Sequence, residues 1–133
     1  MSQNNISAAL SSQLDTLSGD YAIHFENAAF TPPAGEPYLA ESINPTNTIP
    51  MAIASTGSEL LQGFYQVLCY APAGLNKGAA FAGAGAVEAA FQRGDRFTYD
   101  GQEVTILRVE RSTGFRSGDR YVVPLSIYYR AAQ

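Results

Sequence analysis

The spacing of apolar residues predicts two helices. Residues 3–17 repeat large aliphatic side chains at the spacing of a single helix face, which is typical of an amphipathic helix. The repeat consists of Ile6, Leu10, Leu14 and Leu17. Residues 75–93 contain a second stripe, formed by Phe81, Ala84, Val87 or Glu88, and Phe91. Alanine and glycine are abundant there, so we expect the backbone of this helix to lie close to a sheet or to a neighbouring subunit.

Alternation of apolar and polar residues predicts strands between and after the helices. The expected strands cover residues 21–26, 38–43, 63–71, 96–99, 103–111 and 121–130. Residues 63–71 are apolar on both faces, which predicts a central strand covered on both sides. Asp100-Gly101 is a strong hairpin signal. Pro124 lies inside the last strand, so we expect an edge position or a bulge there.

Three connections differ in character. Residues 25–39 contain Pro32, Pro33 and Pro37, which fix φ and push the preceding residues to extended geometry, so this segment is expected to be a stiff arm. Asn44-Pro45-Thr46-Asn47 has turn chemistry, and residues 46–59 have no clear period, which indicates a long excursion of a hairpin. Residues 112–119 form a polar turn.

The order of these elements is helix, strand, strand, long loop, strand, helix and three strands. This order predicts an α+β fold, a mostly antiparallel sheet with two helices packed on one face. The 133 residues fit a single domain, residues 1–133, and a hydrophobic content of 46% is enough for a real core.

Composition and charge argue against some classes of function. The chain carries 12 acidic and 8 basic residues, a net charge of −4, which argues against a dedicated nucleic-acid binder. A ring through which DNA passes without tight binding stays compatible with this charge. Cys69 is the single cysteine, which favours a reducing compartment. No signal peptide or membrane span is expected.

The sequence contains little that points to a catalytic site or a cofactor site. His24 and Cys69 could form a dyad, but no motif flanks either residue, so we interpret Cys69 as a small buried residue. His24 with scattered carboxylates shows no metal-ligand spacing. Gly83-Ala84-Gly85 lies inside a helical pattern, which is the wrong context for a phosphate loop. The acids of the final hairpin are best explained as solvated strand positions, although a hydrolytic carboxylate pair is conceivable. We therefore expect no enzyme activity, no cofactor and no metal.

Arginines gather in one region of the sequence, at Arg108, Arg111, Arg116 and Arg120. Glu110 and Asp119 are interleaved with them. Two interpretations stay open. One is a soluble hairpin of mixed charge that protects the edge of the sheet. The other is a surface of ion pairs between subunits.

Several segments, in order along nearly the whole chain, resemble the small tail terminator proteins of tailed bacteriophages. The resemblance is carried by Phe25-Glu26-Asn27, Pro32-Pro33-Ala34-Gly35-Glu36-Pro37-Tyr38-Leu39, Gly63-Phe64-Tyr65-Gln66-Val67, Tyr70-Ala71-Pro72-Ala73-Gly74, Phe91, Arg93-Gly94 and the final strand ending in Tyr129-Arg130-Ala131. Each segment is weak alone, and their joint order is more specific. The glycine-rich second helix and residues 46–59 depart from the pattern.

The resemblance implies a tail-terminator-like fold and a structural role in the virion, at the tail and neck, after synthesis in the bacterial cytoplasm. Such a protein forms a homo-hexameric ring that caps the tail tube and stops its polymerisation. Its implied partners are other copies of itself, the major tail-tube protein and the head-tail connector or stopper protein. Genome DNA would pass through the lumen without specific binding, and no membrane is involved.

The resemblance carries no catalytic residues to transfer, so candidate assembly positions come from the exposed connections. We expect the proline arm, the 44–60 loop and the 112–120 turn to meet neighbours. The candidate residues are Pro32, Pro33, Asn47, Ile49, Met51, Arg111, Arg116 and Asp119. Three alternatives stay open. They are another phage neck protein, such as a head-closure or adaptor protein; a small-ligand-binding or enzymatic α+β domain built around His24; and a host-interaction protein.

Overall fold

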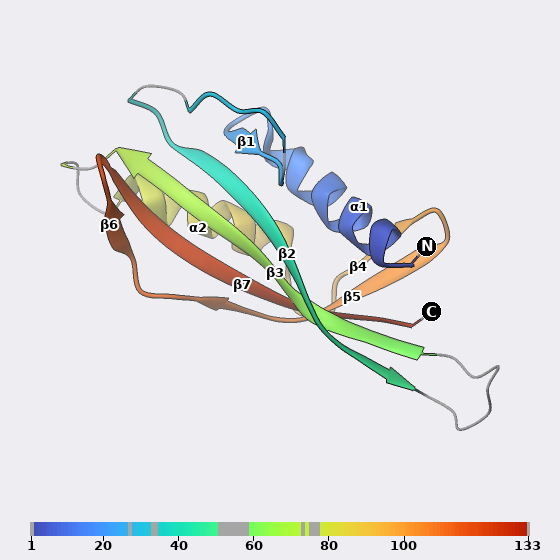
Figure 1. Ribbon diagram of the computed structural model, residues 1–133. Coiled ribbons are helices and arrows are strands. Elements are labelled where there is room, and N and C mark those ends of the chain that lie inside the picture. The colour runs from blue at the N-terminus through green and yellow to red at the C-terminus, as the bar shows by residue number, and fades with distance from the viewer. Residues whose placement is uncertain are drawn as a thin grey trace.

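The protein folds as a long, curled sheet with two helices on one face (Figure 1). The computed structural model describes residues 2–26, 28–32, 35–50, 59–72, 74 and 78–132, and the side chains of these apart from residues 2, 3, 44–50, 59, 60 and 132. The helical elements are α1 (Ser2–Leu14), the short 3-10 helix η1 (Asp15–Leu17) and α2 (Gly78–Ala90). The strands are β1 (Ala22–His24), β2 (Tyr38–Pro50), β3 (Glu59–Pro72), β4 (Arg96–Tyr99), β5 (Gln102–Arg111), β6 (Phe115–Ser117) and β7 (Arg120–Ala132). The predicted α+β class is confirmed.

The strands lie in the order β1-β2-β3-β7-β5-β4, and β6 pairs with the start of β7. Every pairing is antiparallel except β1 with β2, which is parallel and pairs Ala22 with Tyr38. Parallel neighbours need a crossover of about a dozen residues. The proline-rich segment between β1 and β2 supplies this crossover, so its length follows from the topology.

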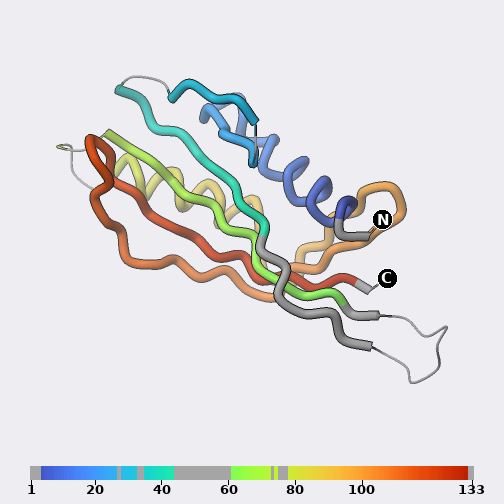
Figure 2. Tube along the Cα trace, in the orientation of Figure 1, coloured from blue at the N-terminus to red at the C-terminus, as the bar shows by residue number. Residues whose placement is uncertain are grey.

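The core lies between the sheet and the helices. Residues of β3 alternate strictly between buried and half-buried positions: Tyr65, Val67 and Cys69 are buried, whereas Phe64 and Gln66 are not. We call the helix-covered side the inner face and the opposite side the outer face. The prediction that this strand is covered on both faces is therefore wrong, because both helices lie on the same side (Figures 1 and 2).

Helix α1 buries Ile6, Leu10 and Leu14 as its spacing predicts. Its Gln13 side chain donates a hydrogen bond of 2.9 Å to the carbonyl of Ala90 at the end of α2. Residues 15–17, which the sequence assigns to the same helix, form η1. Neither helix in the described part of the chain is long and apolar enough to cross a membrane.

Helix α2 packs on the sheet through its smallest residues. Ala80, Gly83, Ala84 and Val87 are buried. The prediction that Phe81 belongs to the packed stripe is wrong, because its side chain is 37% exposed. A Cβ atom at Gly83 would lie 3.7 Å from the Cβ of Cys69 on β3. The expected close approach of this helix to a sheet is confirmed.

The predicted turn at Asn44-Pro45-Thr46-Asn47 is wrong. Strand β2 continues through it and pairs with β3 as far as Pro50 opposite Glu59. The register shifts between Pro45 and Asn47, which is a β-bulge at Thr46. The region that the sequence assigns to a loop is thus largely a hairpin, and its residues 51–58 lie outside the described part of the chain.

The expected edge position or bulge at Pro124 is also wrong, because β7 lies between β3 and β5 and the β3–β7 register is unbroken where Leu68 pairs with Pro124. The carbonyl of Pro124 accepts a hydrogen bond of 2.9 Å from the amide of Ser112. The N and C=O of a strand residue point to the same side, so the proline nitrogen also faces Ser112. Strand β5 has ended at Arg111 by this point. No ladder donor is required there, and the proline is tolerated in a central strand.

Candidate assembly surface

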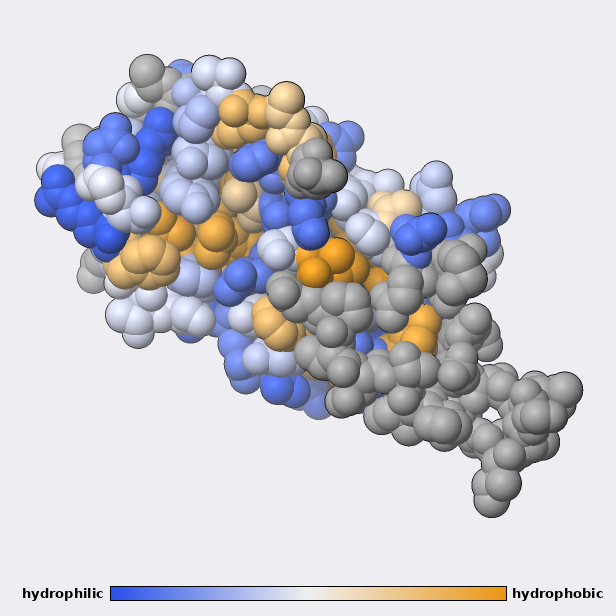
Figure 3. Space-filling model, in the orientation of Figure 1, coloured by the Kyte–Doolittle hydropathy of each residue, from blue (hydrophilic) through white to orange (hydrophobic). Residues whose placement is uncertain are grey.

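The outer face of the sheet carries a line of aromatic side chains. Tyr38 stacks on Tyr70 with ring centroids 4.5 Å apart, and farther along the sheet Phe64 lies 5.9 Å from Tyr128. These rings come from β2, β3 and β7, and no helix covers them (Figure 1). Figure 3 shows apolar atoms along this face between polar ones. Phe64, Tyr70 and Tyr128 are half-buried, and Tyr38 is buried. Apolar surface that stays partly open to solvent marks a candidate interaction site.

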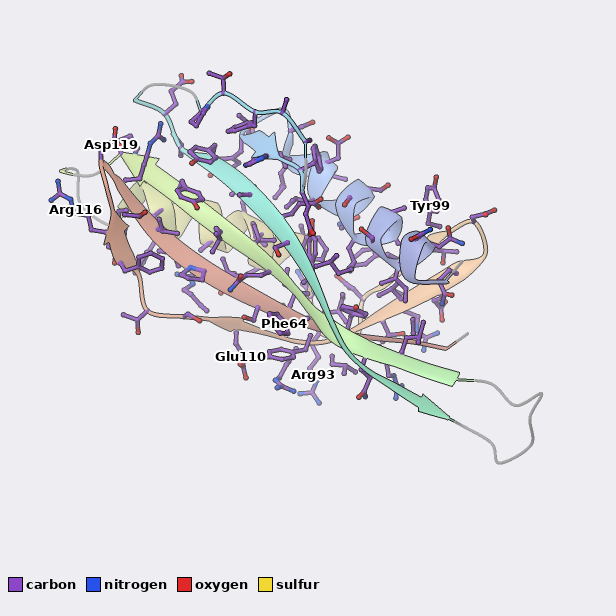
Figure 4. All side chains as sticks on the ribbon, in the orientation of Figure 1. Phe64, Arg93, Tyr99, Glu110, Arg116 and Asp119 are labelled. Atoms are coloured by element: carbon purple, nitrogen blue, oxygen red, sulfur yellow. The ribbon has the colours of Figure 1, made fainter. Side chains whose placement is uncertain are left out.

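Arginine side chains accompany the aromatic rings. The guanidinium of Arg108 lies 3.9 Å from the centre of the Tyr128 ring and forms an ion pair of 3.0 Å with Glu110. A cation over an aromatic ring is attracted by the ring's quadrupole. Figure 4 shows Phe64 and Glu110 about halfway along the length of the sheet. Phe64 and Tyr128 alternate with buried residues in the sequence, which indicates that they lie on the outer face. They were nevertheless not among the predicted assembly positions.

The proline arm folds back on its own chain. Phe30 lies 4.9 Å from His24 and 5.2 Å from Tyr38, measured between ring centroids. Arg120 donates a hydrogen bond of 2.6 Å to the carbonyl of Glu36, and its guanidinium lies 5.0 Å from the centre of the Tyr38 ring. Pro32 is exposed. The two ends of the arm are thus fixed on β2 and β7.

A partly buried hydrogen-bond network anchors the start of the arm. Glu41 on β2 faces inward and accepts hydrogen bonds from the hydroxyl of Ser11 at 2.7 Å, from the hydroxyl of Tyr65 and from the amide of Glu26 at 3.0 Å. The carboxylate of Glu26 in turn accepts a bond of 2.7 Å from the amide of Ile43. Burial raises the pKa of Tyr65, and the negative charge of Glu41 raises it further. One carboxylate therefore connects α1, β3 and the arm.

The predicted arginine cluster is divided between the two faces. Arg111 is on the inner face, where it binds Glu88 of α2 through two bonds of 2.7 and 3.1 Å. Its guanidinium also lies 5.2 Å from the centre of the Phe81 ring. Arg111 thus connects β5 to α2 within the protomer.

The other predicted positions lie at separate ends of the molecule. Arg116 and Asp119 are exposed at the turn between β6 and β7 (Figure 4). The nitrogen Nε of Arg116 donates a bond of 3.3 Å to the carbonyl of Gly118. Asn47 and Ile49 lie on strand β2. The predicted positions Pro33 and Met51 fall outside the described residues.

The fold separates the two residues considered for nucleophilic chemistry. Cys69 is buried on the inner face against α2, and burial raises the pKa of its thiol to about 12. His24 stacks on Phe30, and its Nε2 lies 3.1 Å from the carbonyl oxygen of Ala28. Within the described residues, no three His, Cys, Asp or Glu side chains gather as a metal site.

Comparison with protein families shows which family the chain belongs to. The family model of the phage tail terminator protein matches residues 5–129. The chain belongs to the phage tail terminator family. Members of this family are structural, non-enzymatic proteins of the phage tail, and this protein is accordingly a structural component of the virion. Among curated protein sequences, none matches this chain.

Two solved structures share the fold of this chain. One protein structure superposes with a TM-score of 0.80 at 25% identity and covers 98% of this chain and 96% of its own. A chain from the virion of a native gene transfer agent particle superposes with a TM-score of 0.64 at 15% identity, over 99% of this chain and 98% of its own. At this low identity the second match concerns the fold alone.

Proposed function

We propose that this protein terminates the phage tail. Six copies form a ring on the last ring of the tail tube, stop its polymerisation and provide the surface that joins the head. The observation that carries this proposal is the family match over residues 5–129. The major tail-tube protein and the head-tail connector or stopper protein are the partners that the role requires.

The shape of the protomer supports a ring. Closed rings with a single type of subunit use head-to-tail contacts, in which two different surfaces meet. The outer face of the sheet and its β1 edge are different surfaces of this protein, so they can serve as such a pair. The net charge of −4 suits a lumen through which DNA passes without being held.

We assign two regions to contacts with partners. The β2–β3 hairpin still pairs at Pro50 opposite Glu59, beyond the last pair of β3 with β7 at Leu60 opposite Ala132. This hairpin, with Asn47, Ile49 and Met51, is the candidate contact with the tube or a neighbouring subunit. The β6–β7 turn, with Arg116 and Asp119, is the candidate border of the ring surface or lumen.

The experiment removes the gene from the phage and supplies it again from a plasmid. Without the protein we expect tails of uncontrolled length that do not join heads, and complementation should restore a uniform length in electron micrographs. Tails of normal length that fail only to join heads would overturn the proposal and indicate a head-closure or adaptor protein.

Variants in the complementing gene test the two regions separately. Deletion of residues 47–57 should abolish length control, because it removes the end of β2 that pairs with β3 at Pro50 opposite Glu59. Charge reversal of Arg116 to Glu should impair head joining. Length control that survives the deletion, or head joining that survives the reversal, would remove the respective region from the assembly surface.

A further inference from the structure

Charge is strongly segregated along this chain. Residues 1–76 contain six acidic residues and neither lysine nor arginine, so all eight basic residues follow position 76. The acidic residues are Asp15, Asp20, Glu26, Glu36, Glu41 and Glu59. A chain that assembles with copies of itself at a net charge of −4 has to overcome mutual repulsion. Segregated charge offers a way to do so, provided that the two parts lie on different surfaces.

The arginine patch lies on the outer face near the end of β7. We define it as Arg96, Arg108 and Arg130 with the rings of Phe64 and Tyr128. Strand register places them together, because Thr105 lies opposite both Arg96 and Arg130, and Tyr128 lies opposite both Phe64 and Arg108. Facing residues on neighbouring strands have Cβ atoms about 5 Å apart.

The patch combines exposed arginines with an apolar centre of aromatic rings. Arg96 and Arg130 are exposed, and neither forms an ion pair with another described residue. Arg108 is held over the Tyr128 ring at 3.9 Å. Aromatic rings and arginines together are the residue types that dominate the energy of protein interfaces.

The acidic edge lies at the other end of the molecule. We define it as Asp15, Asp20 and Glu36, which are exposed and whose carboxylates form no ion pair with another described residue. Arg120 lies beside this edge and donates a hydrogen bond to the backbone carbonyl of Glu36. Asp20 and Glu36 each precede by two residues the first β1–β2 pair, Ala22 with Tyr38. In Figure 1, β1 lies beside the last turn of α1, whereas β7 ends at the opposite end of the sheet.

We infer that the arginine patch of one copy docks on the acidic edge of the next copy around the ring. The two surfaces are different and lie far apart on the protomer, which is the arrangement that a head-to-tail contact needs. Opposite charges orient the two copies, and the Phe64 and Tyr128 rings supply the apolar contact. This inference rests on the proposed terminator function, since it names the subunit contact of that ring.

Salt dependence gives the first test, by sedimentation velocity of the purified full chain. Contact between opposite charges predicts that self-association weakens as salt rises, because exposed charges are screened. An interface of apolar groups alone predicts the reverse, because salt would screen the repulsion between net negative copies. Association that strengthens with salt would overturn the inference, as would a chain that stays monomeric at every salt and protein concentration.

Charge-reversal variants give the decisive test. The first variant carries Arg96→Glu and Arg130→Glu, and the second carries Asp15→Lys and Asp20→Lys. Each places like charges on both sides of the contact, so each alone should lose roughly tenfold or more in self-association. In an equal mixture every contact can again join opposite charges, so we expect alternating rings to form.

The mixture also contains its own controls. The two variants change the net charge by the same amount in opposite directions, so the mixture keeps the average charge of the wild type. Restored assembly shows that both variants fold. Glu103→Lys is the matched control, because it reverses an exposed acidic residue outside the acidic edge and should not weaken self-association.

Two outcomes overturn the inference: either variant alone assembles as the wild type does, or folded variants fail to assemble when mixed. Fold is checked by circular dichroism. The tail-length assay reports separately on the proposed function. If the charge variants assemble as the wild type does and still control tail length, the proposed function holds and this subunit contact does not.

Discussion

At the scale of single residues, Glu41 connects three parts of the protomer, namely α1, β3 and the proline arm. Replacement by Leu removes the acceptor of the Tyr65 and Ser11 hydroxyls and of the Glu26 amide. Tyr65 is buried, and a buried hydroxyl without a partner costs about 1–3 kcal/mol. We expect Glu41→Leu to lower the free energy of unfolding by about that amount in urea titrations.

The control for Glu41 is Glu110→Gln, which breaks an exposed ion pair with Arg108. Such pairs contribute about 0–1 kcal/mol. The double variant Glu41→Leu/Tyr65→Phe should recover part of the loss, since no hydroxyl is left unpaired. Equal losses for Glu41→Leu and Glu110→Gln would show that the network does not stabilise the fold.

Tyr129 gives a second residue-scale prediction, on pH. Its buried hydroxyl has no hydrogen-bond partner among the described residues, and burial raises its pKa to about 12. In the unfolded chain a tyrosine ionises near pH 10. Between these values the unfolded chain binds fewer protons than the native state, so the free energy of unfolding falls as pH rises above about 10.

Replacement of Tyr129 by Phe should make that alkaline decrease shallower in urea titrations at several pH values. At neutral pH the same variant should be neutral or up to about 1 kcal/mol more stable, because an unpaired buried hydroxyl is removed. An unchanged slope above pH 10 would mean that Tyr129 does not titrate differently in the native state.

At the scale of elements, Arg111 and Glu88 connect the end of β5 to α2. Their side chains are 28% and 38% exposed, so solvent weakens the pair and we expect about 1 kcal/mol or less from it. Arg111→Glu should therefore lower stability slightly through repulsion from Glu88. The swapped double variant, Arg111→Glu with Glu88→Arg, should restore it in thermal unfolding.

The swap separates an internal role for Arg111 from a role between subunits. If Arg111 serves only the β5–α2 connection, the swapped protein should assemble as the wild type does. Assembly that stays impaired after stability has been restored would return Arg111 to the subunit interface.

Sequence reasoning about elements succeeded where one local signal dominated. The Ile6, Leu10, Leu14 spacing predicted α1, and Asp100-Gly101 predicted the β4–β5 hairpin, where both residues have positive φ. It failed where a partner strand supplied what the local sequence lacks. Pro45 and Pro124 read as a turn signal and an edge signal, yet pairing with β3 holds both in extended strands.

At the scale of the whole molecule, the sequence predicts how the helices and the sheet are layered. It does not predict the candidate assembly surface. Helix and strand order gave two helices on one face of a mostly antiparallel sheet. The arginine patch depends on register between β3, β4, β5 and β7, which brings together residues up to 66 positions apart, Phe64 and Arg130. No local pattern contains that information.

The proline arm is the last feature whose role belongs to the whole molecule. Phe30 and Arg120 fix its two ends to the protomer, and exposed Pro32 lies between them. Replacement of Pro32 and Pro33 by Gly increases the conformational entropy of the unfolded chain, at about 0.4–1 kcal/mol per site. It also loosens an exposed crossover that we expect to contact the neighbouring subunit.

We therefore expect the double glycine variant to reduce ring assembly far more than it reduces monomer stability. Sedimentation velocity measures the first quantity, and urea unfolding measures the second. Phe30→Ala is the comparison, because it removes the ring that fixes the arm to Tyr38 while both prolines stay in place. Equal losses of assembly and stability in the glycine variant would limit the arm to its topological role, the crossover that makes β1 and β2 parallel.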